Sequence, residues 1–171
     1  MYTLYHHPFC PHSRFIRLVL GEHGLDLRLV EERAWERREG FLVLNPAGTT
    51  PVLMADGFPP IPGAGIIAEY LDETHGLEAG ERRLLPASMG ERVEVRRLMA
   101  WFNEKFFEEA SNPLVTERIY KRFMSEEHGG GSPATDVIRA PKGNVRYHLA
   151  YSGWLAQTRN FLAGDRSSYA A

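Results

Sequence analysis

The chain of 171 residues is long enough for one large domain or two small ones with a buried core. Its 43% hydrophobic and 25% charged residues are ordinary for a globular protein, and a formal net charge of -2 gives no reason to expect nucleic acid as a partner. No apolar run approaches the roughly 20 residues that span a bilayer, and residues 1–8 do not resemble a secretory signal. A single cysteine excludes an internal disulfide, so we expect a cytoplasmic protein without membrane insertion.

The chain begins with a strand and a helix. Residues 1–6 are short, aromatic and β-prone, which predicts a strand. Pro8 and Pro11 favour a loop after it, because proline interrupts a ladder of hydrogen bonds. Apolar residues recur at helical spacing from Ser13, with Pro11 suited to the first turn, and Gly24 is a predicted stop.

A second strand, a second helix and a hairpin follow. Residues 26–31 alternate as a strand, and residues 35–44 predict a short, highly charged helix. Residues 50–54 and 58–61, joined across an Asp-Gly turn, predict a hairpin, and a helix is expected over residues 63–74. This order of elements is typical of a thioredoxin-like unit.

A polar connector divides the chain. Residues 77–86 predict a linker, which separates a thioredoxin-like domain at residues 1–76 from a helical part at residues 87–171. The expected fold class is therefore α/β followed by all-α.

Three helices are expected in the second part. A long helix over residues 89–110 is predicted to end at Asn112-Pro113, and residues 114–124 to form a separate short one. The buried face of the long helix is predicted to comprise Val93, Val95, Leu98, Met99, Phe102 and Phe106. After a glycine-rich loop, the last helix is expected from Lys142 or Asn144 to Leu162, because Pro141 would interrupt anything longer.

Cys10 is the most reactive residue type at a predicted loop-to-helix junction, where the sequence reads Cys-Pro-His-Ser. Backbone N–H groups and the helix dipole at such a terminus stabilise a thiolate. With Ser13 in place of a second thiol, catalysis would proceed through a mixed disulfide with a small thiol. The alternative is a cysteine that packs as a small apolar residue.

Histidines beside this cysteine raise the question of a metal. His6, His7, Cys10 and His12 carry zinc-ligand groups. His6 lies on a strand, however, and the two prolines turn the other side chains apart, so we expect no metal site.

Two surfaces are candidates for contact with a protein partner. Trp35 lies in the charged helix, where an exposed tryptophan among arginines is typical of interaction hot spots. Residues 118–124 are basic and aromatic, and their candidate contacts are Arg118, Tyr120, Lys121, Arg122 and Phe123. The alternative for the Trp35 surface is a solvated face with one anchored tryptophan. The second surface is too short for nucleic acid.

Several motifs resemble the glutathione transferase superfamily. They are Cys-Pro at a helix start, NPAGTTPVL at residues 45–53, the helix with Glu69-Tyr70-Leu71, and AGDR at residues 163–166. The resemblance covers the whole chain and implies a thioredoxin-like domain followed by a helical transferase domain. It also implies that the Thr50-Pro51 bond is cis. Transferase chains continue for further helices, so we expect the helical domain to be incomplete here.

The resemblance also predicts a degenerate glutathione site. In the superfamily, the helix after the hairpin usually opens with Glu-Ser or Gln-Ser, which hold the γ-glutamyl end of glutathione. Here Gly63-Ala64 occupies that place, beside Thr50 and Pro51. Loss of both side-chain partners lowers affinity by roughly two orders of magnitude or more, so glutathione binding is expected to be weak or absent.

Within the superfamily, the sequence around Cys10, the missing Glu-Ser pair and the segment 118–133 resemble the FtsZ-localised transferase-like proteins of alphaproteobacteria. That resemblance implies a dimeric, non-catalytic adaptor at the division site, which binds filaments of the tubulin-like GTPase FtsZ and regulates cell division. Two alternatives remain at this point. One is a glutathione-dependent enzyme that uses Cys10, and the other is a structural dimer with an unknown partner.

Overall fold

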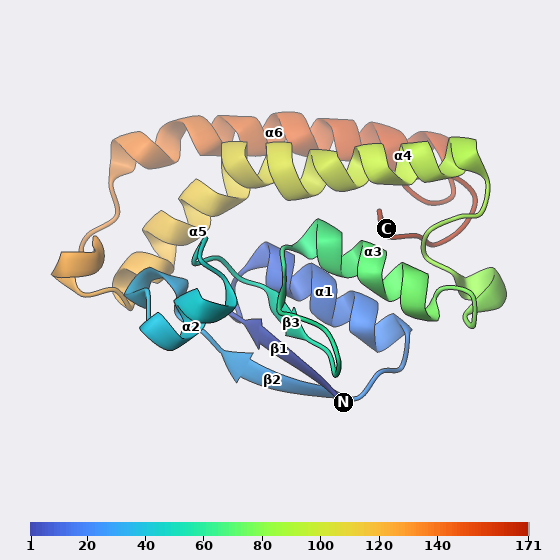
Figure 1. The fold of residues 1–171 in the computed structure, drawn as a ribbon. Coiled ribbons are helices and arrows are strands. Elements are labelled where there is room, and N and C mark those ends of the chain that lie inside the picture. The colour runs from blue at the N-terminus through green and yellow to red at the C-terminus, as the bar shows by residue number, and fades with distance from the viewer. Residues whose placement is uncertain (171) are drawn as a thin grey trace. The chain divides into compact units, whose positions relative to one another are not determined.

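The computed structural model describes residues 1–170. The chain forms two compact units, residues 1–75 and the residues from Gly76 onward (Figure 1). None of the described helices is long and apolar enough to cross a membrane.

The first unit contains a four-stranded mixed sheet in the order β2-β1-β3-β4. Its strands are β1 (Tyr2–His6), β2 (Leu27–Glu31), β3 (Val52–Met54) and β4 (Ile61–Pro62). β1 pairs with β2 in parallel and with β3 antiparallel, and β3 pairs antiparallel with β4. The expected thioredoxin-like arrangement is thereby confirmed.

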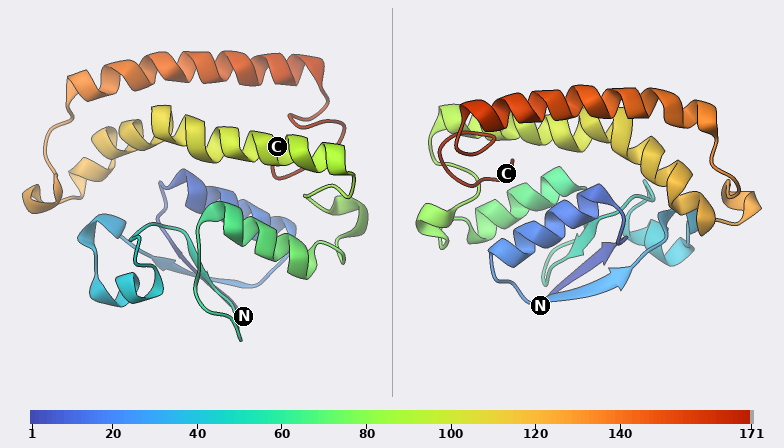
Figure 2. Two further views of the ribbon diagram at one scale, coloured as in Figure 1. Left: turned by 45° about the horizontal axis from the view of Figure 1, so that its top comes forward. Right: turned by 180° about the vertical axis from the view of Figure 1, so that it is seen from behind.

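Helices α1 (Pro11–Glu22) and α3 (Ala64–His75) pack side by side against the sheet (Figures 1 and 2). Their apolar faces meet the central strands, because apolar residues three and four apart lie on one side of a helix. The fully buried side chains of this core are Leu4, Ile16, Leu20, Leu53, Ile67 and Leu71.

The helix predicted over residues 35–44 is broken into two pieces. A 3-10 turn at Ala34–Glu36 and the helix α2 (Glu39–Leu44) are separated by Arg37, whose φ of 46° is left-handed. Trp35 packs on His7, while Phe41 packs on Tyr5 and is only 1% exposed. Residues six apart in one helix face different directions, so a continuous helix could not place both rings against Tyr5 and His7 near the end of β1.

The second arm of the hairpin is also shorter than expected. The arm was predicted over residues 58–61, but β4 contains only Ile61 and Pro62. Pro59 and Pro60 have no N–H to donate to β3, so pairing begins only after them.

The second unit is built around two antiparallel helical rods (Figures 1 and 2). One rod is continuous through α4 (Met89–Ala100), a π-helical segment (Trp101–Ser111) and α5 (Asn112–Arg118), and the other is α6 (Thr135–Thr158). Short 3-10 turns lie at Gly80–Arg82, Tyr120–Arg122 and Glu126–His128. Val95, Leu98 and Met99 are buried as predicted, but Val93 is 62% exposed and does not belong to the buried face.

The predicted helix end at Asn112-Pro113 is wrong, because the rod continues through both residues to Arg118. Proline offers no N–H to the carbonyl four residues earlier, which is that of Glu109. The wider π-helical turns precede this point, and the Asn144 side chain donates a 2.9 Å hydrogen bond to the Glu109 carbonyl. The Asn144 side chain of α6 therefore donates the hydrogen bond that Pro113 cannot donate to this carbonyl. Residues 114–124 accordingly form no separate helix.

The start predicted for the last helix is wrong as well. α6 begins at Thr135 and includes Pro141, whereas Lys142 or Asn144 was expected, and it ends at Thr158 rather than Leu162. Ile138 and Pro141 are both buried, so packing of the first turns offsets the roughly 3 kcal/mol that an internal proline costs.

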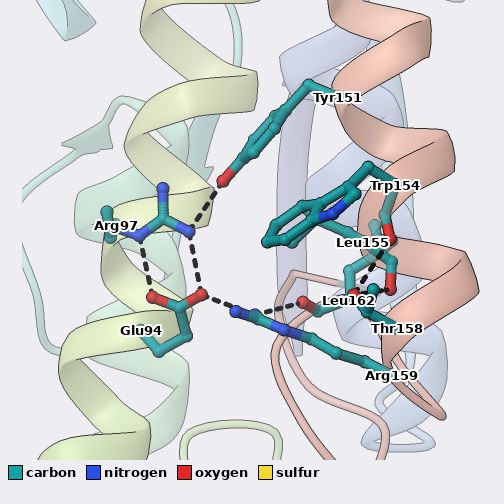
Figure 3. Close-up of polar contacts among 8 residues, drawn as sticks. All are labelled: Glu94, Arg97, Tyr151, Trp154, Leu155, Thr158, Arg159 and Leu162. Atoms are coloured by element: carbon teal, nitrogen blue, oxygen red, sulfur yellow. Dashed lines mark hydrogen bonds and ion pairs between the residues drawn. The ribbon is translucent and has the colours of Figure 1, made fainter.

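A network of charged groups joins α4 to the end of α6 (Figure 3). Glu94 accepts hydrogen bonds of 2.7 Å from Arg97 and 2.6 Å from Arg159, and Arg97 also donates to the Tyr151 hydroxyl. The hydrogen bond from Arg97, opposed by partial burial and reinforced by Arg159, lowers the pKa of Glu94 to about 2. Arg159 donates further to the Leu162 carbonyl, which holds the segment after α6.

The segment after α6 returns to the connector before α4. Tyr169 donates a backbone hydrogen bond of 3.1 Å to the Leu84 carbonyl, and Ser168, Tyr169 and Ala170 are buried.

Candidate functional site

Cys10 is the N-cap residue of α1, as the sequence predicts for a thiol at a helix start. Its sulfur accepts the N–H of Ser13 at 3.5 Å, and the thiol lies 3.7 Å from the Thr50 carbonyl, to which it donates. The side chain is only 7% exposed. Reactive cysteines are usually partly accessible, so this geometry favours a thiol that packs and caps.

Ser13 has a structural part in the same loop. It is fully buried, and its hydroxyl accepts the backbone N–H of His7 at 3.3 Å. The Cys10 N–H donates to the His7 carbonyl at 3.0 Å, which closes the turn. The Cys-x-x-Ser motif therefore fixes the loop between β1 and α1 through both of its polar side chains.

The Thr50-Pro51 peptide bond is cis, as the resemblance implied. The Thr50 carbonyl faces the Cys10 thiol, and the Pro51 carbonyl accepts the N–H of Gly63 at 3.1 Å. The structure thus brings together Cys10, Thr50, Pro51 and Gly63, which the sequence had assigned to one site.

Gly63 and Ala64 form the wall where a transferase would hold the γ-glutamyl group. Gly63 has a φ of 90°, and Ala64 is buried at the start of α3. No acidic side chain occupies the first turn of this helix. The remaining polar groups here are backbone N–H groups, which bind an anion more weakly than a complete set of side chains.

Trp35 lies against the loop that carries Cys10. Its ring meets His7 edge-on at a centroid distance of 5.1 Å, and the residue is half-buried. Burial lowers the pKa of His7, so this imidazole is neutral at pH 7. Trp35 thus contributes to packing, and only part of its surface is accessible to a partner.

The segment 118–124 divides into anchoring and exposed residues. Lys121 pairs with the buried Glu117 at 2.7 Å, and Glu117 also accepts the N–H of Ala134. The Lys121 ammonium therefore helps to join α5 to the start of α6. Arg118 and Arg122 are exposed instead, and Phe123 is 51% exposed.

The described histidines and carboxylates form no metal centre. His6 and His7 are buried, and residues 1–170 contain no group of three potential ligands close enough to hold a metal ion.

The sequence motifs point to no role for α6, yet the structure places a basic groove on it. Arg139, Lys142 and Arg146 line this groove. The signal that could have revealed it is charge patterning, because Asp136 is the single acidic residue among the 24 residues of α6.

The fold agrees with comparisons to known proteins. A domain family described as "Glutathione S-transferase, N-terminal domain" matches residues 4–81. A glutathione S-transferase structure from Sinorhizobium meliloti 1021 superposes with a TM-score of 0.97 at 49% identity, covering 99% of this chain and 74% of that one.

Two further matches are FtsZ-localized protein A and the structure of FzlA. "FtsZ-localized protein A" of Caulobacter vibrioides is 37% identical over 171 residues, which span 98% of this chain and 72% of the relative. The structure of FzlA from C. crescentus superposes with a TM-score of 0.87, covering 99% of this chain and 73% of that one. The chain therefore belongs to the glutathione S-transferase superfamily, and within it to the family of FtsZ-localized protein A.

Proposed function

We propose that this protein is a transferase-like adaptor that binds filaments of the division GTPase FtsZ and acts at the division site as a homodimer. The observation that carries the proposal is the similarity to FtsZ-localized protein A, which extends over 98% of the chain.

The state of the glutathione site supports an adaptor. The wall of the site is Gly63 and Ala64, and the thiol of Cys10 is buried and engaged with Thr50 and Ser13. Each lost charge-assisted contact removes about 1.5–3 kcal/mol from the binding of a carboxylate. Calorimetric titration with glutathione is expected to show a dissociation constant weaker than about 1 mM, and a dissociation constant of about 1 mM or tighter would contradict this expectation.

The exposed part of the segment 118–124 is the proposed contact surface. Arg118 and Arg122 are spaced four residues apart, and both are exposed beside Phe123. Arginine is enriched in interaction hot spots, and phenylalanine is among the aromatic residues enriched at interfaces. Lys121 is less suitable, because its charge already pairs with Glu117.

Co-sedimentation with GTP-assembled FtsZ filaments tests the proposal directly. The wild-type protein is expected to pellet with filaments at micromolar concentration. The double variant Arg122→Glu/Phe123→Ser is expected to lose about tenfold or more in affinity, because it removes a ring and reverses a charge at once.

Arg82→Glu is the matched control, since Arg82 is exposed and lies in the 3-10 turn at the other end of the helical unit (Figure 1). It changes the net charge as Arg122→Glu does, and its pelleting is expected to equal that of the wild type. Absence of the wild-type protein from the filament pellet would refute the proposed function. Equal loss in both variants would refute the assigned surface.

A glutathione transferase or glutathione-dependent thiol transferase is the second candidate. It is favoured by the 49% identity to the Sinorhizobium structure and by the position of Cys10 at a helix N-terminus. Conjugation of glutathione to a chlorodinitrobenzene electrophile separates the two functions. Turnover that disappears in Cys10→Ser would establish the enzyme, and the adaptor proposal expects none above the uncatalysed rate.

A further inference from the structure

A groove runs along the first half of α6. Its volume is about 390 Å³, and it is lined by Thr135, Ile138, Arg139, Lys142, Gly143 and Arg146. Ile138 is buried at its base, whereas the three cationic residues are exposed. The groove belongs entirely to the second unit, and it contains none of the residues in the glutathione site or in the segment 118–124.

The cations of this groove have no counter-charge. Arg139, Lys142 and Arg146 are separated by three and four residues, so they lie on one face of the helix. Within residues 1–170, none of the three forms an ion pair or a side-chain hydrogen bond, and no carboxylate lines the groove. Elsewhere in this unit the cations Arg97, Lys105, Lys121 and Arg159 are each paired with a glutamate.

The hollow of the groove lies beside its cations and not at the helix start. Ala134 occupies the N-cap position, and its N–H already donates to the Glu117 carboxylate, so the positive potential comes from the three cations. Gly143 leaves the middle of the groove hollow, since a Cβ built there meets nothing within 4 Å. A cavity and three unpaired cations therefore coincide.

We propose that this α6 groove binds the carboxylates of an extended acidic segment in a protein partner. Carboxylates at alternate positions of an extended chain are roughly 7 Å apart, and successive cations on α6 are separated by roughly 4.5–6 Å along the axis. Two or three charge-assisted hydrogen bonds thus form without a change in α6. The proposal stands whether or not FtsZ is a partner.

Nucleic acid fits the groove less well. Strong binding to a phosphate backbone comes from many contacts spread over an extended basic surface, and this groove offers three cations in a chain of net charge -2. A polypeptide with a few carboxylates matches both the charge and the size of the groove.

Fluorescence anisotropy with a labelled peptide of about twelve residues, with glutamate at every second position, tests the proposal on the full chain. Saturable binding in the range of about 10–100 µM is expected at low salt, and it is expected to weaken severalfold when ionic strength rises to about 0.3 M. The double variant Arg139→Glu/Arg146→Glu is expected to weaken binding at least about tenfold.

Two further variants make the result specific. Gly143→Leu fills the hollow without changing charge and replaces glycine by a better helix former, so the fold is retained while affinity falls about fivefold. Arg82→Glu changes the net charge away from the groove and is expected to leave affinity within about twofold. Unchanged circular dichroism and elution volume are expected for all variants.

Four results would overturn the proposal. These are no saturation by about 1 mM peptide, equal binding of a glutamine peptide, equal weakening in Arg82→Glu, and tighter binding of an oligonucleotide or inorganic phosphate through the same cations. A change in oligomeric state in Arg139→Glu/Arg146→Glu would assign the groove to an interface between copies of this chain and would also overturn it.

Discussion

At the start of α3, Gly63 lacks the side chain with which a transferase would hold the γ-glutamyl group. Its backbone conformation is also one that glycine adopts easily. Its φ of 90° is one that residues with a Cβ rarely adopt, and its N–H donates to the Pro51 carbonyl. A Gly63→Glu substitution would therefore strain the backbone at this position as well as change the surface of the site.

Gly63→Ala is accordingly expected to lower the free energy of unfolding by about 1–2 kcal/mol. The neighbouring Gly65→Ala is the control, since Gly65 lies in the first turn of α3 with open space around it. That variant is expected to raise the free energy by about 0.5 kcal/mol, because alanine favours the helix. Urea denaturation of the two proteins measures both changes, and equal effects of the same sign would contradict the assignment.

Two candidate contact residues acquire structural roles in the structure. Trp35 packs on His7, and Lys121 neutralises the buried Glu117, whose pKa is lowered by that hydrogen bond. Residue type identified both as interaction candidates, but it could not distinguish an exposed side chain from one anchored by a partner distant in sequence.

At the scale of elements, the π-helical segment and Asn144 explain how the first rod passes Pro113. The Asn144 side chain donates to the carbonyl of Glu109, to which residue 113 has no N–H to offer. A local rule predicts a helix end here, whereas a neighbouring helix supplies the missing donor.

We expect Asn144→Ala to lower the free energy of unfolding by about 1–2 kcal/mol, because it leaves a partly buried carbonyl without its donor. In a Pro113→Ala background, residue 113 regains an N–H, and the cost of Asn144→Ala is expected to fall below about 0.5 kcal/mol. Urea denaturation of the four proteins in this double-mutant cycle gives the coupling. Gln157→Ala on the exposed face of α6 controls for helix propensity, and additive effects would contradict the explanation.

At the scale of the molecule, the groups with lowered pKa values titrate at higher pH in the first unit than in the second. Burial lowers the pKa of His6, His7 and His23 in the first unit below the ordinary 6.5. In the second unit, hydrogen bonds from Arg97 and Arg159 lower the pKa of Glu94 from 4.5 to about 2. In both cases the unfolded state binds more protons than the folded state as pH falls.

The stability contributed by the histidines is therefore complete above about pH 6.5 and is lost as pH falls through their lowered pKa values, whereas that of Glu94 persists down to about pH 4.5. Between about pH 7.5 and 5.5, the urea midpoint of the first unit is expected to fall more than that of the second. Labelling with fluorotryptophan and ¹⁹F NMR measures the two urea midpoints separately, because Trp35 lies in the first unit and Trp101 and Trp154 lie in the second. Equal shifts at all three positions would contradict this expectation.

Local sequence was sufficient where a motif encodes its own geometry. The Cys-Pro helix start and the order of strands and helices in the first unit were predicted from the residues and are confirmed, and the cis bond at Thr50-Pro51, which the resemblance implied, is confirmed as well. The helix start depends on residues adjacent in the chain and on a proline that fixes the backbone φ by itself.

Tertiary structure alone decided the rest. The passage of helices through Pro113 and Pro141 depends on burial and on a donor from another helix, which no local pattern contains. The basic groove on α6 likewise depends on which cations find a glutamate nearby and which do not. The physical reason is common to both cases: an unsatisfied polar group acquires or lacks a partner only when distant segments pack together.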